Sequence, residues 1–335
     1  MQKKIIALAV AGLVSGAAFA QTSNVTIWGI ADVSYGYFSK SHNADTKSVS
    51  AMSDGYQDAS RVGFKGTEDL GNGLSAFFSF EQRFLLDEAD IGGRNSHLGL
   101  TSKSWGTVRA GSFGSVHDDY NGYSESGGMG YGNGTVHNIG EDNAHNAIEY
   151  ISPNFSGLEF KLGLSTAYQG SEEEAVDLDN SALNADINDR AYFAAIAYNN
   201  GGLKLAATYD TTSYQVENAD TDSGNEYMLA ASYNFGPVAI GAGYDRTKFF
   251  NQDVRKTWRV TAAAPITAND TIGLSYSRGS VDIDEGESYD AKGWGVSYSH
   301  AMSKRTNLYA TYGQMSQDNE LNNTDYSFAL AESYE

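Results

Sequence analysis

Apolar and polar residues alternate with a period of two along most of this chain. The clearest example runs from Leu158 to Leu164, where every second residue is leucine or phenylalanine and the residues between them are polar or small. Alternation of this kind predicts a β-strand with one apolar face. Sixteen such segments, divided by turn signals, are predicted as strands: 25–38, 58–68, 72–85, 94–102, 106–113, 146–152, 157–168, 188–199, 202–214, 225–234, 237–249, 254–264, 269–280, 288–300, 304–316 and 323–334.

Short turns and long acidic loops alternate between these segments. Asn200-Gly201 is a two-residue turn, for example, whereas residues 39–57 and 114–145 are long loops. Half-buried strands of a soluble sandwich would show the same face pattern. Connections that are short at one end and long at the other are instead typical of transmembrane barrels, and an even number of strands lets the last strand pair with the first. Tyrosines also recur just before short turns, where a membrane boundary would lie: Tyr150, Tyr198, Tyr233 and Tyr298.

The predicted fold class is therefore all-β, a transmembrane antiparallel β-barrel of 16 strands that forms a single domain over residues 21–335. A barrel of this size encloses an aqueous channel rather than a packed core.

Residues 1–20 are typical of a secretory signal peptide. Two lysines precede a ten-residue apolar run, and Ala18-Phe19-Ala20 forms a small-x-small cleavage site. The apolar run is too short to span a membrane, and a buried N-terminal helix is the alternative interpretation. We expect export, with Gln21 as the first mature residue.

The composition excludes several kinds of chemistry. The chain has no cysteine, so disulfides and thiolate sites are unavailable. Its formal net charge of −20 makes it a poor partner for nucleic acid. The six histidines include no His-x-x-x-His pair, and no cofactor fingerprint is present. The segment His117-Asp118-Asp119 could bind a cation weakly. The simpler interpretation is that these three residues lie on a solvated loop. We expect no cofactor, no metal and no enzymatic activity.

Residues 114–145 form the most unusual connection. This loop holds eight glycines, five acidic residues and three histidines but no lysine or arginine. Structureless loops of this length are uncommon in compact domains and are usually functional or disordered. We expect this loop to determine what the barrel does.

Several segments resemble the Gram-negative general porin family. The first strand, Val25 to Val33, is similar to the first strand of that family, and the block from Ser60 to Leu74 is the most specific match. Further matches follow in family order at 76–84, 98–100, 106–108, 146–158 and 303–309. The resemblance implies a 16-stranded homotrimeric barrel in the outer membrane of a Gram-negative bacterium, surrounded by its lipids and passing small hydrophilic solutes and ions by diffusion. It also implies that the third long loop, 114–145, folds into the lumen.

The resemblance further implies a constriction between loop carboxylates and basic residues of the wall. The positions that match, or lie on the same face as a match, are Arg61, Lys65, Glu81, Arg83 and Arg109 on the wall and Asp118, Asp119, Glu125, Glu141 and Asp142 on the loop. The chain departs from the family pattern where Ser112 and Asn143 stand in place of arginines. With these two arginines missing, a basic-free loop and a strongly acidic chain, we expect the pore to prefer cations.

Two other functions remain open. Tyr120, Tyr123 and Tyr131 could form a stacking surface for sugar rings, as in a channel selective for sugars or organic solutes. A mainly structural barrel, such as an adhesin or cell-wall tether, is a third class.

The final residues, Tyr334-Glu335, depart from the terminal aromatic of the family, which is consistent with altered assembly or a truncated sequence.

Overall fold

The computed structural model describes residues 24–38, 48–55, 57–87, 90–125, 143–166, 176–177, 182–183, 190–214, 222–248, 253–283, 288–317 and 326–334. The signal peptide predicted over residues 1–20 lies outside these ranges and stays a prediction. Glu141, Asp142 and Tyr131 also lie outside the described residues.

Sixteen long strands dominate the described chain, one at each of the predicted positions. Apart from three short strands, they are β1 Asn24–Phe38, β3 Arg61–Gly71, β4 Leu74–Leu85, β5 Asp90–Ser102, β6 Gly106–Gly114, β7 Asn143–Ile151, β8 Leu158–Ser165, β11 Arg190–Asn200, β12 Leu203–Tyr214, β13 Asp222–Asn234, β14 Ala239–Lys248, β15 Val254–Pro265, β16 Asp270–Asp282, β17 Tyr289–Ala301, β18 Thr306–Gln317 and β19 Tyr326–Tyr334.

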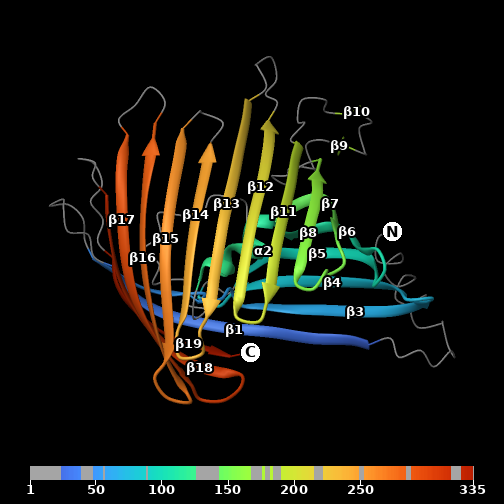
Figure 1. Ribbon diagram of the computed structural model, residues 1–335. Helices are drawn as coiled ribbons and strands as arrows, with labels where there is room; N and C mark the ends of the chain where they lie inside the picture. The colour runs from blue at the N-terminus through green and yellow to red at the C-terminus, as the bar shows by residue number, and fades with distance from the viewer. Residues whose placement is uncertain are drawn as a thin grey trace.

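Each of these sixteen strands is antiparallel to two neighbours. Strands adjacent in the chain pair with one another, β8 pairs with β11, and β1 pairs with β3. The ladder returns to its first strand because β19 also pairs with β1, with Val33 opposite Glu332. A membrane-spanning sheet requires this arrangement, since an unpaired edge in lipid would leave backbone groups without hydrogen bonds. Figure 1 shows β11 to β17 side by side.

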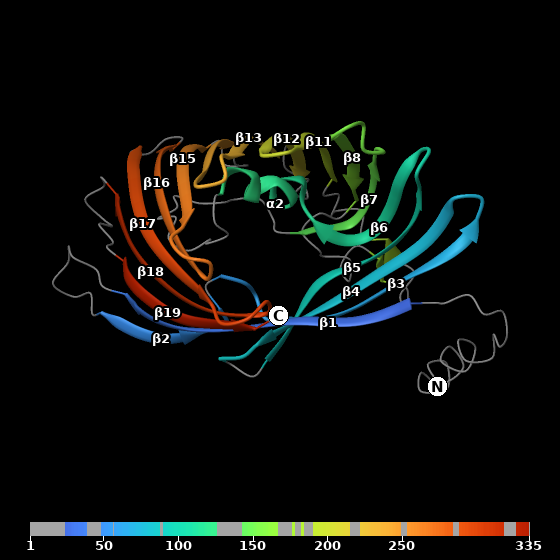
Figure 2. The same cartoon turned by 60° about the horizontal axis from the view of Figure 1, so that its bottom comes forward.

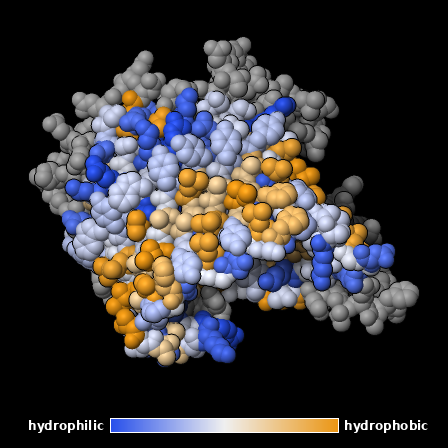
Figure 3. Space-filling view, viewed as in Figure 1, coloured by the Kyte–Doolittle hydropathy of each residue, from blue (hydrophilic) through white to orange (hydrophobic). Residues whose placement is uncertain are grey.

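The strands carry their apolar side chains outward and their polar side chains inward. On β15, Trp258 and Val260 are more than 40% exposed, whereas the alternating Thr257 and Arg259 are buried. On β8 the most exposed residue is Leu162, and its neighbour Lys161 is buried. A soluble protein buries its apolar side chains and exposes its polar ones. The reverse arrangement seen here is typical of a barrel with lipid outside and a polar lumen. In Figure 3 hydrophobic residues gather over the middle and lower part of the face in view, below a hydrophilic rim.

The short turns lie where the sequence predicts them. Between β3 and β4 the chain reverses at Asn72, which has a positive φ of 53°, and the Asp69 carboxylate accepts a hydrogen bond from Gly71 N at 2.8 Å. Positive φ is tolerated by asparagine better than by most residues. The tyrosines expected beside short turns occupy the corresponding strand ends; Tyr150 Oη, for example, donates to Trp105 O at 2.8 Å.

Three short strands fall within segments that we predicted as loops. Strand β2 (Val49–Ser53) pairs with the second half of β1, beyond Ile30, where the pairing of β1 with β3 ends. It forms because β1 is longer than its partner and its remaining backbone groups need a neighbour. Strands β9 (Val176–Asp177) and β10 (Ala182–Leu183) pair only with each other.

In the described part of the chain, one α-helix interrupts the all-β pattern. Helix α2 (Val116–Asn121) and the single turn η1 (Gly122–Ser124) lie at the start of the long loop that follows β6. Figure 2 shows α2 inside the curve of the sheet, against the wall that contains β12 and β13. The described part of the third long loop is therefore folded into the lumen, as predicted.

Candidate functional site

Helix α2 begins at a side-chain cap. The Oγ of Ser115 accepts a hydrogen bond from Asp118 N at 3.1 Å, and Asp118 and Asp119 occupy the first turn. A serine cap and acidic residues at this end satisfy free backbone N–H groups and oppose the positive end of the helix dipole. We predicted no helix here. The signal that would have indicated one is the spacing of Ser115 and Asp118, which is that of a capping box.

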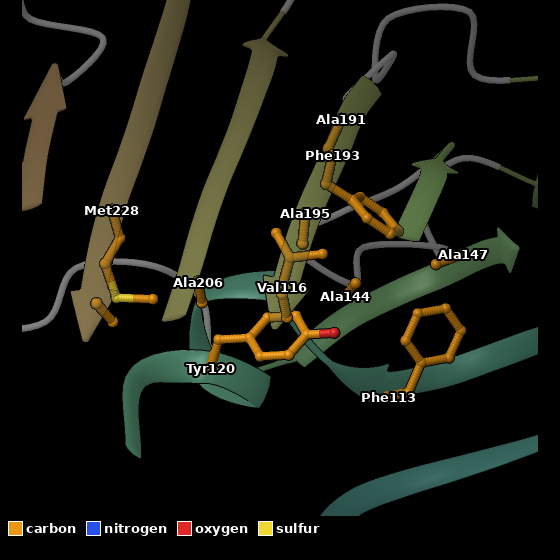
Figure 4. Close-up of a cluster of buried hydrophobic side chains, with 12 residues drawn as sticks. Phe113, Val116, Tyr120, Ala144, Ala147, Ala191, Phe193, Ala195, Ala206 and Met228 are labelled. Carbon is orange, nitrogen blue, oxygen red and sulfur yellow. The ribbon is translucent and has the colours of Figure 1, made fainter. Parts of the chain in front are cut away.

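An apolar contact holds α2 on the barrel wall. Val116 and Tyr120 are buried against a lumen face that consists mainly of alanine, together with Met228 (Figure 4). The small side chains leave room for the helix at this place, where a water-lined wall would carry larger polar groups. The wall residues of this cluster are Phe113, Ala144, Ala147, Ala191, Phe193, Ala195, Ala197, Ala206, Met228 and Ala230.

The end of the helical segment is held against two other strands. Thr261 on β15 donates through Oγ1 to the carbonyl oxygen of Ser124 at 2.9 Å. Gly241 and Gly243 on β14 face the same segment, and a Cβ added at Gly241 would lie only 2.4 Å from Ser124 O. The loop can approach the wall this closely because glycine occupies both positions.

Arg109 joins the loop to the wall through a four-residue charge cluster. Its Nε donates to Glu149 Oε2 at 2.7 Å, and its Nη2 donates to Asp119 Oδ2 at 3.3 Å. Lys161 donates to the same Asp119 carboxylate. Arg109 and Asp119, one from the predicted wall set and one from the predicted loop set, are thus in contact. Glu149 and Lys161 were missed, although alternation places both on the lumen face.

Glu125 also has a basic partner. Its Oε1 lies 3.4 Å from Nη1 of Arg259 on β15, at the other end of the helical segment from Arg109. We expected the loop acids to face a thinned set of basic residues, and for Asp119 and Glu125 this is wrong. Arg255 and Arg259 lie on the opposite face of β15 from Trp258, so the sequence pattern already places both arginines on the inner face. The sequence does not show that the loop reaches β15.

The remaining predicted wall residues form a separate group on β3 and β4. Arg61 and Lys65 both lie over the ring of Trp28, with centroid distances of 5.8 Å and 5.7 Å. The register places Arg61 opposite Arg83. Arg61, Lys65 and Arg83 therefore share one face of the sheet.

The ion partners of this group come from the wall and the first loop. Arg61 pairs with Asp58 at 3.6 Å, Arg83 with Asp54 at 3.0 Å, and Glu81 with Arg94 at 3.3 Å. Within the described residues, none of these ion pairs reaches α2 or η1. Arg94 was not predicted.

Ser112, which stands where the family pattern has an arginine, makes a hydrogen bond within the wall. Its Oγ lies 2.9 Å from Nδ1 of His145, so the position links β6 to β7 by a hydrogen bond. Of the loop acids, Asp118 lies in the first turn of α2, and Glu141 and Asp142 fall outside the described residues.

The tyrosines of the helical segment are anchors rather than an open stacking surface. Tyr120 is only 4% exposed, and its Oη donates to Glu159 Oε1 at 2.9 Å. Burial raises the pKa of Tyr120, and the Glu159 carboxylate raises it further, so the phenol remains a proton donor. Burial likewise raises the pKa of Tyr123, whose ring packs edge-on against Tyr120 at a centroid distance of 5.3 Å. The proposed sugar-stacking role of Tyr120 is therefore wrong.

His117 attaches α2 to β12. Its Nε2 lies 2.8 Å from Asp210 Oδ2, and its Nδ1 lies 2.6 Å from Thr208 Oγ1. Burial acts to lower the pKa of His117, but the hydrogen bond and charge of Asp210 outweigh burial and the pKa is raised. We considered His117 only with its neighbours in the sequence, Asp118 and Asp119. The structure instead turns it toward the wall.

No helix in the described part of the chain is both long and apolar enough to cross a membrane.

Comparison with known proteins agrees with the fold. A family model for Gram-negative porins matches residues 7–320. Outer membrane porin protein 32 of Delftia acidovorans is 32% identical over 329 residues, which cover 92% of this chain and 88% of that protein. An outer membrane porin protein of Bordetella pertussis is 33% identical over 232 residues, covering 63% of this chain and 59% of that protein.

Among solved structures, the anion-selective porin from Comamonas acidovorans has a TM-score of 0.76. It is 23% identical, and the match covers 93% of this chain and 99% of that one. Sequence, strand topology and the inward helix lead to the same conclusion: the chain belongs to the Gram-negative porin family, whose members are proteins of the outer membrane.

Proposed function

We propose that the protein forms a water-filled channel through which small hydrophilic solutes and ions diffuse passively. The observation that carries this proposal is the face pattern of the barrel, which puts charged and hydroxyl side chains such as Arg259 and Thr257 inside and apolar ones outside. A water-filled lumen satisfies such side chains, whereas an apolar interior would not.

Helix α2 and the wall opposite it would form the narrowest part of this channel. The Arg109 cluster with Asp119 and Lys161 lies near the start of the helical segment, and the pair of Glu125 and Arg259 lies at its end. Opposed charges across a lumen create a transverse field that acts on ions and polar solutes. Arg61, Lys65, Glu81 and Arg83 would line the wall beyond the helix.

A preference for cations is the finer part of the proposal. The basic side chains Arg61, Arg83 and Arg109 are each paired with carboxylates, so these three arginines add little free positive charge to the pore. The surplus of acids, a net −20 over the whole chain, then sets the potential at the mouths. The sign of the ion preference is argued from these charges alone. The porin titled anion-selective is only 23% identical, so it shows a shared fold and does not show the selectivity of this chain.

We further propose that three chains assemble as a trimer. One of the solved structures of similar fold, OmpT of Vibrio cholerae, is titled as a trimer form and has a TM-score of 0.67. The exposed apolar side chains of the outer face would contact lipid and neighbouring chains.

Solute uptake into liposomes tests passive diffusion. Liposomes that contain the protein should swell in solutions of several small sugars, at rates that fall smoothly with solute size. Uptake restricted to one sugar, with saturation, would indicate a selective channel instead. No swelling with any solute would contradict the channel, and a structural barrel would then be the better interpretation.

A further inference from the structure

Three side chains of metal-ligand type converge in the contact between α2 and the barrel wall. They are His117 on α2, Asp210 on β12 and Glu226 on β13, and one ligand atom from each lies within 4.8 Å of the other two. All three residues are at most 6% exposed. They come from three separate elements, so only the folded position of the loop brings them together.

This cluster leaves a buried carboxylate oxygen without a hydrogen bond. Glu226 is 5% exposed, and the charged groups that act on its carboxylate are His117, Asp210, Asp245 and Arg255. Asp245 on β14 is part of the same group, and its Oδ2 is buried without a hydrogen-bond partner. Buried carboxylate oxygens nearly always have a hydrogen-bond partner, so the unpaired Oδ2 of Asp245 indicates a missing partner beside the cluster.

The local charge calls for a divalent cation. When they are all ionised, Asp210, Glu226 and Asp245 supply three negative charges. Arg255, which interacts with Glu226 and Asp245, supplies one positive charge. Arg259 also faces Asp245, but it is paired with Glu125. With a neutral imidazole at His117 the cluster keeps two net negative charges, which one M²⁺ ion would balance.

The imidazole is oriented for coordination. Nδ1 of His117 is 2.6 Å from the hydroxyl of Thr208, which leaves Nε2 directed at Asp210. A metal-binding histidine commonly gives its second ring N–H to an oxygen in this way, which fixes the tautomer that has a free lone pair on the other nitrogen. Thr208 would take that role here.

We propose that His117, Asp210 and Glu226 bind one divalent transition-metal ion, with Zn²⁺ as the best-suited ion. Imidazole nitrogen with carboxylate oxygens suits Zn²⁺, whereas sites for Ca²⁺ and Mg²⁺ use oxygen ligands. Tetrahedral Zn²⁺ separates its ligand atoms by about 3.4 Å, so the 2.8 Å contact between His117 and Asp210 opens slightly when the ion enters. The ion bridges α2 to β12 and β13 and fixes the loop on the wall. The alternative is a metal-free contact in which a protonated His117 pairs with Asp210.

The test uses the full-length protein in detergent, stripped of metal with EDTA and titrated with Zn²⁺ in about 150 mM salt to screen diffuse binding. Calorimetry gives the stoichiometry and affinity, and Co²⁺ used as a second probe reports coordination through its visible absorption. The key variant is Glu226→Gln, which keeps the side-chain shape. The control is Glu81→Gln, the same change at a lumen carboxylate that pairs with Arg94. Asp210→Asn is a second variant that serves if Glu226→Gln does not fold.

We expect one Zn²⁺ per chain in the wild type and in Glu81→Gln, with at least about tenfold weaker binding in Glu226→Gln. Zn²⁺ should also raise the unfolding temperature of the wild type and not that of Glu226→Gln, since a ligand that binds only the folded state stabilises it. The absence of stoichiometric binding to the wild type would overturn the proposal in favour of the metal-free contact. Equal affinity in the two glutamine variants would overturn it as well.

Discussion

The Oη of Tyr120 lies 2.9 Å from Oε1 of Glu159, and this hydrogen bond ties the inward helix to β8. The two residues are far apart in sequence but meet because α2 turns back against the strands that follow it. The same face of the helix carries Val116, which is fully buried in the alanine-lined wall. The position of the loop is therefore set by packing and by specific polar contacts together.

Removing this hydrogen bond should loosen the helix without unfolding the barrel. Tyr120→Phe keeps the apolar packing and loses one bond to a charged acceptor, at a cost of about 1.5–3 kcal/mol. We expect a larger current noise in the open channel, because the loop moves more, with the mean conductance little changed. Noise equal to that of the wild type would show that the bond does not restrain the loop.

A side chain at Gly241 should push the loop away from the wall. An added Cβ would lie 2.4 Å from Ser124 O and 2.6 Å from Thr261 Oγ1, so Gly241→Ala displaces the end of the helical segment toward the lumen. The expected result is a lower single-channel conductance.

Gly93→Ala is the matched control for this change, because a Cβ at Gly93 would meet nothing within 4 Å. Equal conductance in the two variants would contradict the close approach of Ser124 to β14.

Loss of Arg109 should destabilise the protein more than loss of Arg61. Glu149 is only 1% exposed and would be left as a buried carboxylate without its arginine, which typically costs about 3–5 kcal/mol. Arg61 pairs with the half-exposed Asp58 at 3.6 Å, and such pairs contribute about 0–1 kcal/mol. Thermal unfolding of Arg109→Ala and Arg61→Ala in detergent measures the difference. A similar fall in both would mean that Glu149 finds another partner.

Two neighbouring residues of β16 should differ in how well they tolerate the same substitution. Leu274 is 54% exposed on the outer face, and Leu274→Arg places a charge in lipid at about 2–4 kcal/mol near the midplane. Ser275 lies on the inner face, so Ser275→Arg should fold almost as well as the wild type. The folded fraction after refolding into lipid vesicles measures both. Equal losses would show that the two faces are assigned wrongly.

The strands could be predicted from the sequence because each carries the alternation over enough residues. Sixteen predicted strands correspond to sixteen observed ones, with most ends within three residues. The prediction ended β3 at residue 68, but the ladder continues to Gly71, since the acidic residues before the turn still pair with β4. Charge alone therefore does not mark the end of a strand.

The contacts of the loop could not be predicted in the same way. Alternation places Lys161, Arg255 and Arg259 on the inner face, but their partners depend on where α2 lies across the lumen. Glu125 meets Arg259 more than a hundred residues away, and no local pattern encodes that pairing. The helix itself is too short for a helical period to be visible, and only the Ser115 cap marks its start.

The ion selectivity of the open channel tests the central claim most directly. The measurement is the zero-current potential of single channels in a planar lipid bilayer with a KCl gradient across it. We predict stable open steps and a potential of the sign given by K⁺ preference, since the paired arginines leave the acidic surplus of the chain uncompensated. A potential of the opposite sign would contradict the cation preference, and the absence of any conductance would contradict the channel itself.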